Sequence, residues 1–158
     1  AEININDHRI RILKPTTYMN DSGRSLAAMT SYFKTPLDHM LIVYDELDLI
    51  PGRAQLKFNG GHGGHNGLRS VLSCVGKAFW RLRLGIGHPG HNHKEQVSNY
   101  VLKKPSKEDQ NAIIDAVMAA IDSLPIFLNE SSERAKTKLH SRGVKAQPYK
   151  TVDSDKSG

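Results

Sequence analysis

The chain has 158 residues, of which 38% are apolar and 24% charged, a composition that fits one soluble globular domain and excludes a disordered chain. Its formal net charge of +6 favours polyanionic partners, because lysines and arginines placed on phosphates release condensed counterions, although a merely basic surface would give the same value. No apolar run approaches the roughly 20 residues that span a bilayer, no secretory signal opens the chain, and a single cysteine excludes an internal disulfide, so we expect a cytoplasmic protein.

The first half of the chain alternates strand and helix patterns. In chain order, these predict a strand at residues 8–14, a loop at 15–20, a helix at 22–33 and a strand at 40–44. The first strand alternates arginine with isoleucine, and the helix carries large apolar side chains at helical spacing. The second strand is a continuous apolar run that ends at Asp45, which predicts burial on both faces of a sheet.

The second half continues the alternation. It predicts strands at residues 53–58 and 80–86, a helix over 68–75 and a further helix from Ser106 onward. Both strands alternate in polarity, and the apolar stripe of the first helix ends at Gly76, a suitable C-cap. Ser106 opens a pattern resembling a capping box, and Pro125 is expected to bend or end the helix that follows.

The order of these elements, β-α-β-β-α-β-α, predicts a single α/β domain, with a mixed, twisted sheet flanked by helices in three layers (α/β/α). We assign residues 1–142 to this domain. Residues 143–158 are rich in lysine, serine and aspartate with almost no apolar side chain, which predicts a disordered polar tail.

Three polar loops are candidates for a functional site: residues 18–20, 45–48 and 60–67. Two of them directly follow predicted strands, and sites in α/β sheets gather at the carboxyl ends of strands. The third combines glycines, which let the backbone approach a ligand closely, with two imidazoles and an amide. It runs into a predicted helix, whose first N–H groups are suited to hold an anion or an oxyanion.

Asp45 ends a predicted buried strand, where a carboxylate is costly unless it is paired or hydrogen-bonded. Aspartates in this position commonly orient an imidazole and stabilise its charged form. The alternative is an aspartate that caps or closes a turn within residues 45–48. The functional interpretation is favoured.

Basic residues supply a candidate anion-binding surface. Arg81 and Arg83 alternate with leucines, so both point to one face of their strand. Together with Lys57 and Lys94 they are candidates for a basic rim around the glycine loop. Solvated charges on a sheet face would give the same pattern, and the sequence does not separate the two.

Other site types are less well supported. Residues 85–90 match G-x-G-x-x-G after a strand, but the residues that follow open no amphipathic helix that would bind a pyrophosphate. Several histidines invite a zinc hypothesis, built above all on His62, His65 and His88, yet none has the spacing of a ligand pair on a helix. Cys74 lies in a helix stripe and no nucleophile elbow is present, so covalent catalysis is not expected.

Four motifs in this order resemble bacterial peptidyl-tRNA hydrolases: KPTTYMN at residues 14–20, DELDL at 45–49, GGHGGHNGL at 60–68 and RLRLGIGHPG at 81–90. The resemblance is dense from about residue 9 to residue 105. It implies hydrolysis of the ester between a peptide and the terminal ribose of tRNA, with water attack under general-base catalysis and without metal, cofactor or covalent intermediate. It also implies a monomer that frees tRNA after aborted translation.

The resemblance further implies roles for individual residues. Asp45 matches the aspartate that orients the base, Asn20 and Asn66 the amides that bind substrate and attacking water, and His65 a position at the water site. For tRNA binding it implies Tyr18 and Met19 beside the tRNA terminus, together with Asn20 and Asn66, and Arg83 on a phosphate, while Lys57 and Lys94 belong to the basic rim.

The sequence departs from the family pattern at two points. The base histidine of the family, and an asparagine before it, lie in a first strand and loop upstream of anything that aligns with Ala1. We therefore expect that the base precedes residue 1, that the sheet has a gap or exposed edges, and that the chain as written is a truncated form whose own activity the sequence leaves open. Asn92 stands where the family has a second phosphate-binding lysine, and Lys94 is close enough to compensate. The alternative function is a non-catalytic tRNA-binding remnant.

Overall fold

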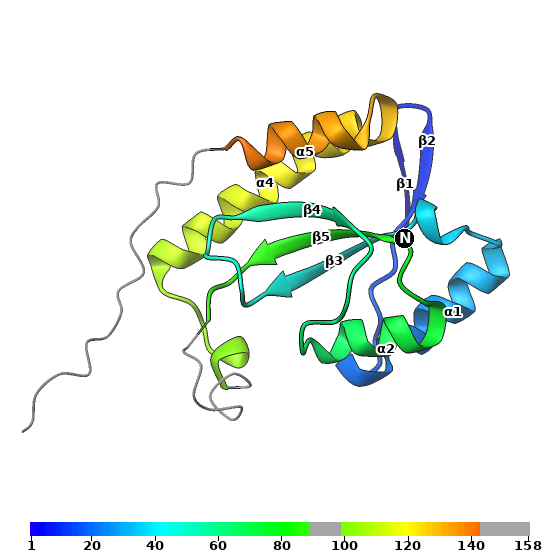
Figure 1. Ribbon diagram of the computed structural model, residues 1–158, viewed down its shortest axis with the longest axis horizontal. Coiled ribbons are helices and arrows are strands. Elements are labelled where there is room, and N and C mark those ends of the chain that lie inside the picture. The colour runs from blue at the N-terminus through cyan, green and yellow to red at the C-terminus, as the bar shows by residue number, and fades with distance from the viewer. Residues whose placement is uncertain (89–98, 143–158) are drawn as a thin grey trace, which may run out of the picture.

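The computed structural model describes residues 1–88 and 99–142, so Lys94, Asn92 and the expected tail at 143–158 lie outside the described residues. The strands are β1 (Glu2–Ile5), β2 (His8–Arg11), β3 (Leu41–Glu46), β4 (Ala54–Phe58) and β5 (Trp80–Gly85). The α-helices are α1 (Ser22–Phe33), α2 (Asn66–Val75), α4 (Lys107–Asn129) and α5 (Ser132–His140). Two short 3-10 helices, η1 (Met19–Asp21) and η2 (Leu37–His39), precede α1 and β3 (Figure 1).

The central sheet has the strand order β3-β5-β4 and is mixed, as predicted. β3 runs parallel to β5, with Leu41 opposite Trp80, whereas β4 runs antiparallel to β5, with Ala54 opposite Leu84. The carboxyl ends of β3 and β5 therefore share one end of the sheet with the start of β4. The end of β4 lies at the other.

Helices cover both faces of this sheet, which confirms the three-layer arrangement (Figure 1). On one face α4 and α5 bury Leu56 and Leu82 against small side chains such as Ala116 and Ala120. On the other face α2 packs Leu68 and Val71 on the sheet, and α1 packs on α2. The small residues of α4 let that helix approach the leucines of the sheet closely, and this core is the main source of stability.

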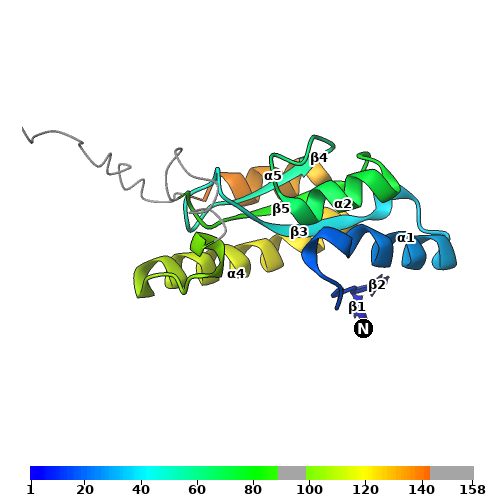
Figure 2. The same ribbon diagram turned by 90° about the horizontal axis from the view of Figure 1, so that it is seen from below.

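The N-terminal strand prediction was only partly right. The predicted strand at 8–14 is shorter, β2, and it forms a hairpin with β1, which the sequence did not predict, in a sheet of its own. Asn6 supplies the positive φ of 51° that the tight turn between them needs. Figure 2 shows the hairpin standing away from the three layers beside α1, where the guanidinium of Arg11 lies 3.8 Å from the ring centroid of Phe33.

The prediction that residues 40–44 are buried on both faces is wrong. Among the described strands β3 is at the edge of the sheet, paired only with β5, and Val43 is 55% exposed. The physical reason is the position of α4 and α5, which pack over β4 and β5 and leave the outer half of β3 uncovered. An apolar run reports the hydrophobicity of a strand but not how many of its sides are covered.

Helix α4 does not end at Pro125 but continues to Asn129. A proline inside a helix costs roughly 3 kcal/mol. The turn after Pro125 regains stability because Phe127 packs edge-to-face on Trp80, with ring centroids 5.1 Å apart. By length and mean hydropathy (1.6) α4 is the one described helix that is apolar enough to cross a bilayer, yet it packs on β4, β5 and α5 as a domain helix does.

His140, at the end of α5, holds that helix on the edge of the sheet. Its Nε2 accepts the backbone N–H of Leu56 at 3.0 Å, which satisfies an outward-facing donor of β4. Burial, followed by the charges of Arg53 and Lys136, lowers the pKa of His140 from its ordinary value of 6.5, and Glu133 opposes this effect. A protonated Nε2 would lose the hydrogen bond from Leu56.

We therefore expect the free energy of unfolding to fall as the pH drops below about 6.5, because in that range the unfolded chain binds a proton at His140 that the folded chain resists. The variant His140→Gln keeps an acceptor that does not titrate and should flatten this dependence. Urea unfolding at a series of pH values between 5 and 8 measures it. His39→Gln, at an exposed position of η2, is the control and should behave as the unchanged protein. An identical pH dependence in all three would contradict the assignment.

Candidate active site

Asp45 and His65 form the centre of the candidate site. Asp45 lies near the end of β3, and its Oδ1 is 3.2 Å from Nε2 of His65, the N-cap residue of α2. The other ring nitrogen of His65, Nδ1, accepts the backbone N–H of Leu68 at 3.1 Å. Because a backbone N–H only donates, the ring proton is on Nε2 and is donated to Asp45. Both ring nitrogens of His65 are therefore occupied in this arrangement.

Asp45 is held as a carboxylate. The hydrogen bond from His65 lowers the pKa of Asp45 below its ordinary value of 3.8, against the opposing effect of burial. The side chain is still 35% exposed, and among the described residues His65 is the one side chain that donates a hydrogen bond to it. Asp45 is thus hydrogen-bonded to an imidazole, that of His65. Its role in orienting the base stays a prediction.

The glycine loop folds as a tight turn in front of α2. Gly63 and Gly64 have φ values of 54° and 84°, a region that side chains disfavour, so the turn itself needs glycine at these positions. The close approach of a ligand to this backbone stays a prediction. Within the turn, Nδ1 of His62 accepts the N–H of Gly64 at 3.0 Å. The turn delivers His65 and Asn66 to the start of α2, at the end of the sheet where β3 ends.

The loop that carries Tyr18, Met19 and Asn20 lies against the same end of α2. Tyr18 and Met19 are exposed, and Met19 packs so closely on Gly67 that a Cβ there would lie 2.5 Å from its Sδ. The same Cβ would lie 3.2 Å from Cε1 of His65, so Met19 and His65 meet at Gly67. The structure thereby brings together the predicted residues of the first and third loops.

A glycine–serine contact fixes this loop to α2. The N–H of Gly23, in the first turn of α1, donates to Oγ of Ser70 at 2.9 Å, and both residues are buried. A Cβ on Gly23 would lie 2.2 Å from the carbonyl oxygen of Ser70, so only glycine permits this approach of α1 to α2. The contact between these two residues was not predicted from the sequence, because a helix crossing depends on a partner far along the chain.

The two arginines of β5 have different environments. Arg83 is 19% exposed, and it pairs with Glu46 (Nε to Oε2, 3.1 Å) and with Gln55 (Nη1 to Oε1, 2.6 Å). Arg81 is 2% exposed and donates to the carbonyls of Gly60 and Gly61. Arg81 therefore belongs neither to a basic rim nor to a solvated face, and instead holds the glycine loop on the sheet. Lys57 is exposed on β4.

Sequence reasoning did not identify the partners of these arginines. The alternation of residues 54–58 already places Gln55 and Lys57 on one face of β4, opposite Leu56. The antiparallel register with β5, which puts Gln55 opposite Arg83 and Lys57 opposite Arg81, becomes known only from the fold. Among the described residues no three metal-ligating side chains of the histidine, cysteine, aspartate or glutamate type lie together.

Known proteins resemble this chain throughout the described region. The family model described as peptidyl-tRNA hydrolase matches residues 1–147. The peptidyl-tRNA hydrolase of Saccharophagus degradans is 51% identical over 144 residues, which are 90% of this chain and 72% of that protein. That of Variovorax paradoxus is 45% identical over 142 residues, 89% of this chain and 67% of that protein.

Solved structures agree with these relatives. The crystal structure of peptidyl-tRNA hydrolase from Acinetobacter baumannii superimposes with a TM-score of 0.83 at 40% identity, over 87% of this chain and 69% of that one. The four sequence motifs, the three-layer fold and the match over nearly the whole chain agree. The chain belongs to the peptidyl-tRNA hydrolase family, in its bacterial form.

Proposed function

We propose that this chain hydrolyses the ester bond between peptide and tRNA in peptidyl-tRNA and so recycles tRNA from aborted translation. The observation that carries the proposal is the Asp45–His65 hydrogen bond at the carboxyl end of β3, next to the loop of Met19 and Asn20. A carboxylate, an imidazole and amides at the edge of an α/β sheet suit the activation of water.

In the proposed reaction a general base takes a proton from water, and the resulting hydroxide adds to the ester carbonyl. The tetrahedral intermediate then expels the ribose oxygen, which receives the proton from the base, and peptide and tRNA are released. The amides of Asn20 and Asn66 bind substrate and the attacking water. Asp45 orients the base and stabilises its charged form.

We assign His65 a positioning role at the water site rather than that of the base. Its Nδ1 lone pair is engaged by Leu68 and its Nε2 proton by Asp45, so neither ring nitrogen can take a proton from water without breaking a contact. By the family resemblance the base is a different histidine, which Asp45 orients. In the proposed mechanism the second oxygen of Asp45 contacts the imidazole of that base.

The start of α2 is the proposed oxyanion site. The backbone N–H groups of Asn66 and Gly67 have no partner within the helix, because the first N–H groups of any helix lack one. The helix dipole adds roughly half a positive charge there. Donors fixed by the fold before the reaction stabilise the developing negative charge without reorganisation.

For tRNA we propose contacts from Tyr18 and Met19 to the terminal nucleoside, and from Arg83, Lys57 and Lys94 to phosphates. Glu46 and Gln55 hold the guanidinium of Arg83 in a fixed orientation, which suits a planar contact to phosphate. Phosphate contacts bind without reading sequence, as an enzyme that serves all tRNAs requires. We further propose that the protein acts as a cytoplasmic monomer without metal or cofactor.

The test is peptide release from a purified peptidyl-tRNA, with the protein expressed together with any residues encoded directly before Ala1. We expect multiple turnover, and ¹⁸O from labelled water in the peptide carboxylate, since water attacks the carbonyl. A chelator should leave the rate unchanged. Salt-sensitive tRNA binding without turnover would favour the non-catalytic alternative, and loss of activity on chelation would favour a metal hydrolase built on His62, His65 and His88.

A further inference from the structure

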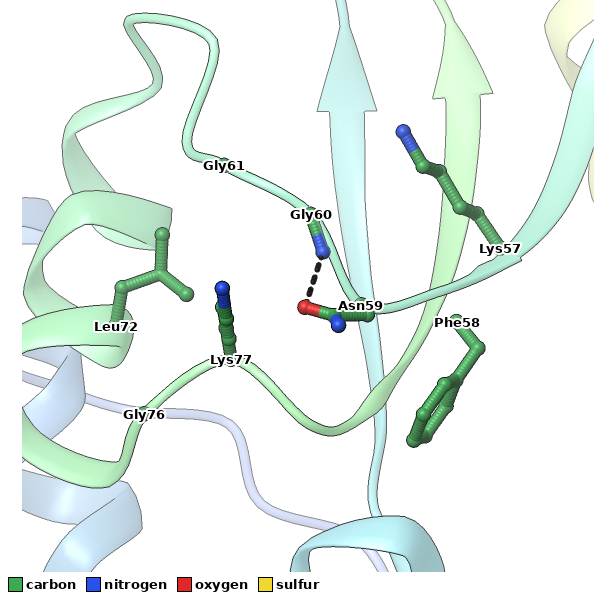
Figure 3. A pocket seen from close by; sticks show the side chains of 8 residues that line it. All are labelled: Lys57, Phe58, Asn59, Gly60, Gly61, Leu72, Gly76 and Lys77. Carbon is green, nitrogen blue, oxygen red and sulfur yellow. Dashed lines mark hydrogen bonds between the residues drawn. The ribbon is translucent and has the colours of Figure 1, made fainter.

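A cleft of about 620 Å³ lies beside the glycine loop, away from Asp45. Its walls come from the end of β4, the first residues of the loop and the C-terminal end of α2 (Figure 3). Because β4 runs antiparallel to β3 and β5, the end of β4 lies at the opposite end of the sheet from Asp45. The cleft is therefore separate from the candidate active site.

The side chains that line the cleft give it a positive charge. Lys57 and Lys77 stand on either side of Asn59 and Gly60 in Figure 3, and none of the lining residues is acidic. Neither lysine has an ion-pair partner among the described residues. The end of α2 contributes only about half a negative charge. Two full positive charges outweigh it.

A third cation lies directly behind the wall of the cleft. The position that a Cβ on Gly60 would take is 3.4 Å from Nζ of Lys57 and 3.6 Å from Cζ of Arg81. Arg81 is buried, and its Nε has no hydrogen-bond partner within the described part of the chain. Carbonyl oxygens and the ring of Phe79, 4.8 Å away, compensate the guanidinium, but no carboxylate of residues 1–88 or 99–142 forms an ion pair with it.

A buried charge without a counter-charge is costly, and an anion nearby reduces that cost. Lys77 on its own is explained by its position at the end of α2, where a cation stabilises the helix dipole. That explanation does not extend to Lys57, which projects from a strand, or to Arg81. Two exposed lysines in one open cleft, with a buried guanidinium behind its wall, favour a ligand with negative charge.

We propose that this cleft binds backbone phosphates of tRNA, with Lys77 as a phosphate contact in addition to Lys57. The identification of the anion as tRNA rests on the proposed function. The cleft is open and formed partly by backbone, which suits a sugar-phosphate chain that passes through it. Contacts of this kind strengthen binding without selecting a base.

The experiment measures binding of deacylated tRNA by fluorescence anisotropy over a range of salt concentrations. At about 0.1 M salt we expect Lys77→Ala to weaken binding roughly five- to tenfold, and to reduce the slope of log K against log salt concentration by about 0.7–0.9, the value for one lost phosphate contact. Lys77→Arg retains the charge and should restore both quantities. The double variant Lys57→Ala, Lys77→Ala should lose more slope than either single variant.

The matched control is Lys138→Ala, which removes the same charge from α5 on the other face of the sheet and should bind as the unchanged protein. If Lys77→Ala and Lys138→Ala have the same affinity and slope, the proposal is wrong. A second outcome would also contradict the proposal: inorganic phosphate binds the unchanged protein but not Lys77→Ala, while both proteins bind tRNA equally well. The cleft would then be a site for a small anion. Thermal unfolding checks that each variant is folded.

The outcome is independent of catalysis. In the hydrolysis assay Lys77→Ala should raise KM and leave kcat unchanged, because the cleft is remote from the reacting ester. A protein that binds tRNA through Lys77 but does not hydrolyse peptidyl-tRNA would uphold the cleft and contradict the proposed function. Turnover of peptidyl-tRNA with no effect of Lys77→Ala on tRNA binding would uphold the proposed function and contradict the role of the cleft.

Discussion

Replacing Asp45 with asparagine is expected to lower kcat for hydrolysis of peptidyl-tRNA by roughly 10²- to 10⁴-fold, with little change in KM. The carboxylate accepts Nε2–H of His65 at 3.2 Å, and in the proposed mechanism its second oxygen contacts the imidazole of the base. An asparagine has one acceptor oxygen and so can accept an N–H from only one of the two imidazoles. Its NH₂ group would face the N–H of the other imidazole, and no hydrogen bond would form there. It also lacks the charge that stabilises an imidazolium in the transition state.

Steady-state and single-turnover rates on one peptidyl-tRNA measure this effect. Asp48→Asn is the matched control, because Asp48 is exposed three positions along the chain and loses the same charge. An equal loss in both variants would attribute the effect to the overall charge of the loop. Full activity in Asp45→Asn would remove Asp45 from the mechanism.

The same carboxylate gives a pH dependence of stability. The hydrogen bond from His65 lowers the pKa of Asp45 in the folded protein, so over a range below its ordinary value of 3.8 the unfolded chain binds a proton there and the folded chain does not. The stability contributed by Asp45 is therefore fully present above its ordinary pKa of 3.8. It is lost as the pH falls through the lower pKa that Asp45 has in the folded protein. The asparagine variant lacks this contribution.

The substitution Gly23→Ala is expected to destabilise the domain by about 3 kcal/mol or more, and to lower Tm by roughly 10 °C. The new methyl group would lie 2.2 Å from the carbonyl oxygen of Ser70, and this atom belongs to the backbone of α2 and cannot rotate away. The helices α1 and α2 must separate. The buried hydrogen bond from Gly23 to Ser70 is then lost as well.

Thermal and urea unfolding measure the change. Gly61→Ala is the control, since a Cβ at Gly61 meets nothing within 4 Å and its φ is not positive. Because α1 directly follows η1, the separation should also displace Met19 and Asn20 and raise KM in the protein that stays folded. A Tm within about 2 °C of the unchanged protein would show that the two helices do not pack as described.

Local patterns predicted most of the elements but not their surroundings. The helix at 22–33 and the strands that became β4 and β5 follow from periodicity, which local sequence determines. The exposure of Val43 depends on where α4 and α5 pack. The continuation of α4 past Pro125 depends on Trp80, which is distant in sequence. Hairpin β1–β2 was missed in part because the alternation of residues 2–5 covers only four residues, too few to establish a strand pattern.

For the candidate site, too, the sequence identified residues but not their contacts. Asp45, His65 and Asn66 were identified because unusual residue types follow predicted strands or open a predicted helix. Their hydrogen-bond partners were not, since the bond between Asp45 and His65 requires the crossing of β3 and α2. Arg81 is the clearest case. Arg81 and Arg83 lie in the same alternating stretch of β5, yet the guanidinium of Arg81 is buried under a loop and that of Arg83 pairs with Glu46 and Gln55.

Because β4 runs antiparallel to β5, the length of these strands separates Asp45 from the lysine cleft. From Leu84, opposite the start of β4, to Trp80, opposite its end, the sheet extends about 13 Å, and the glycine loop spans this length on its way back to α2. A ligand that reaches both the Asp45 end and the lysine cleft must be longer than one nucleoside. A short ester fragment would occupy the Asp45 end alone. We therefore expect the protein to favour whole peptidyl-tRNA over an isolated ester of the same terminal nucleoside.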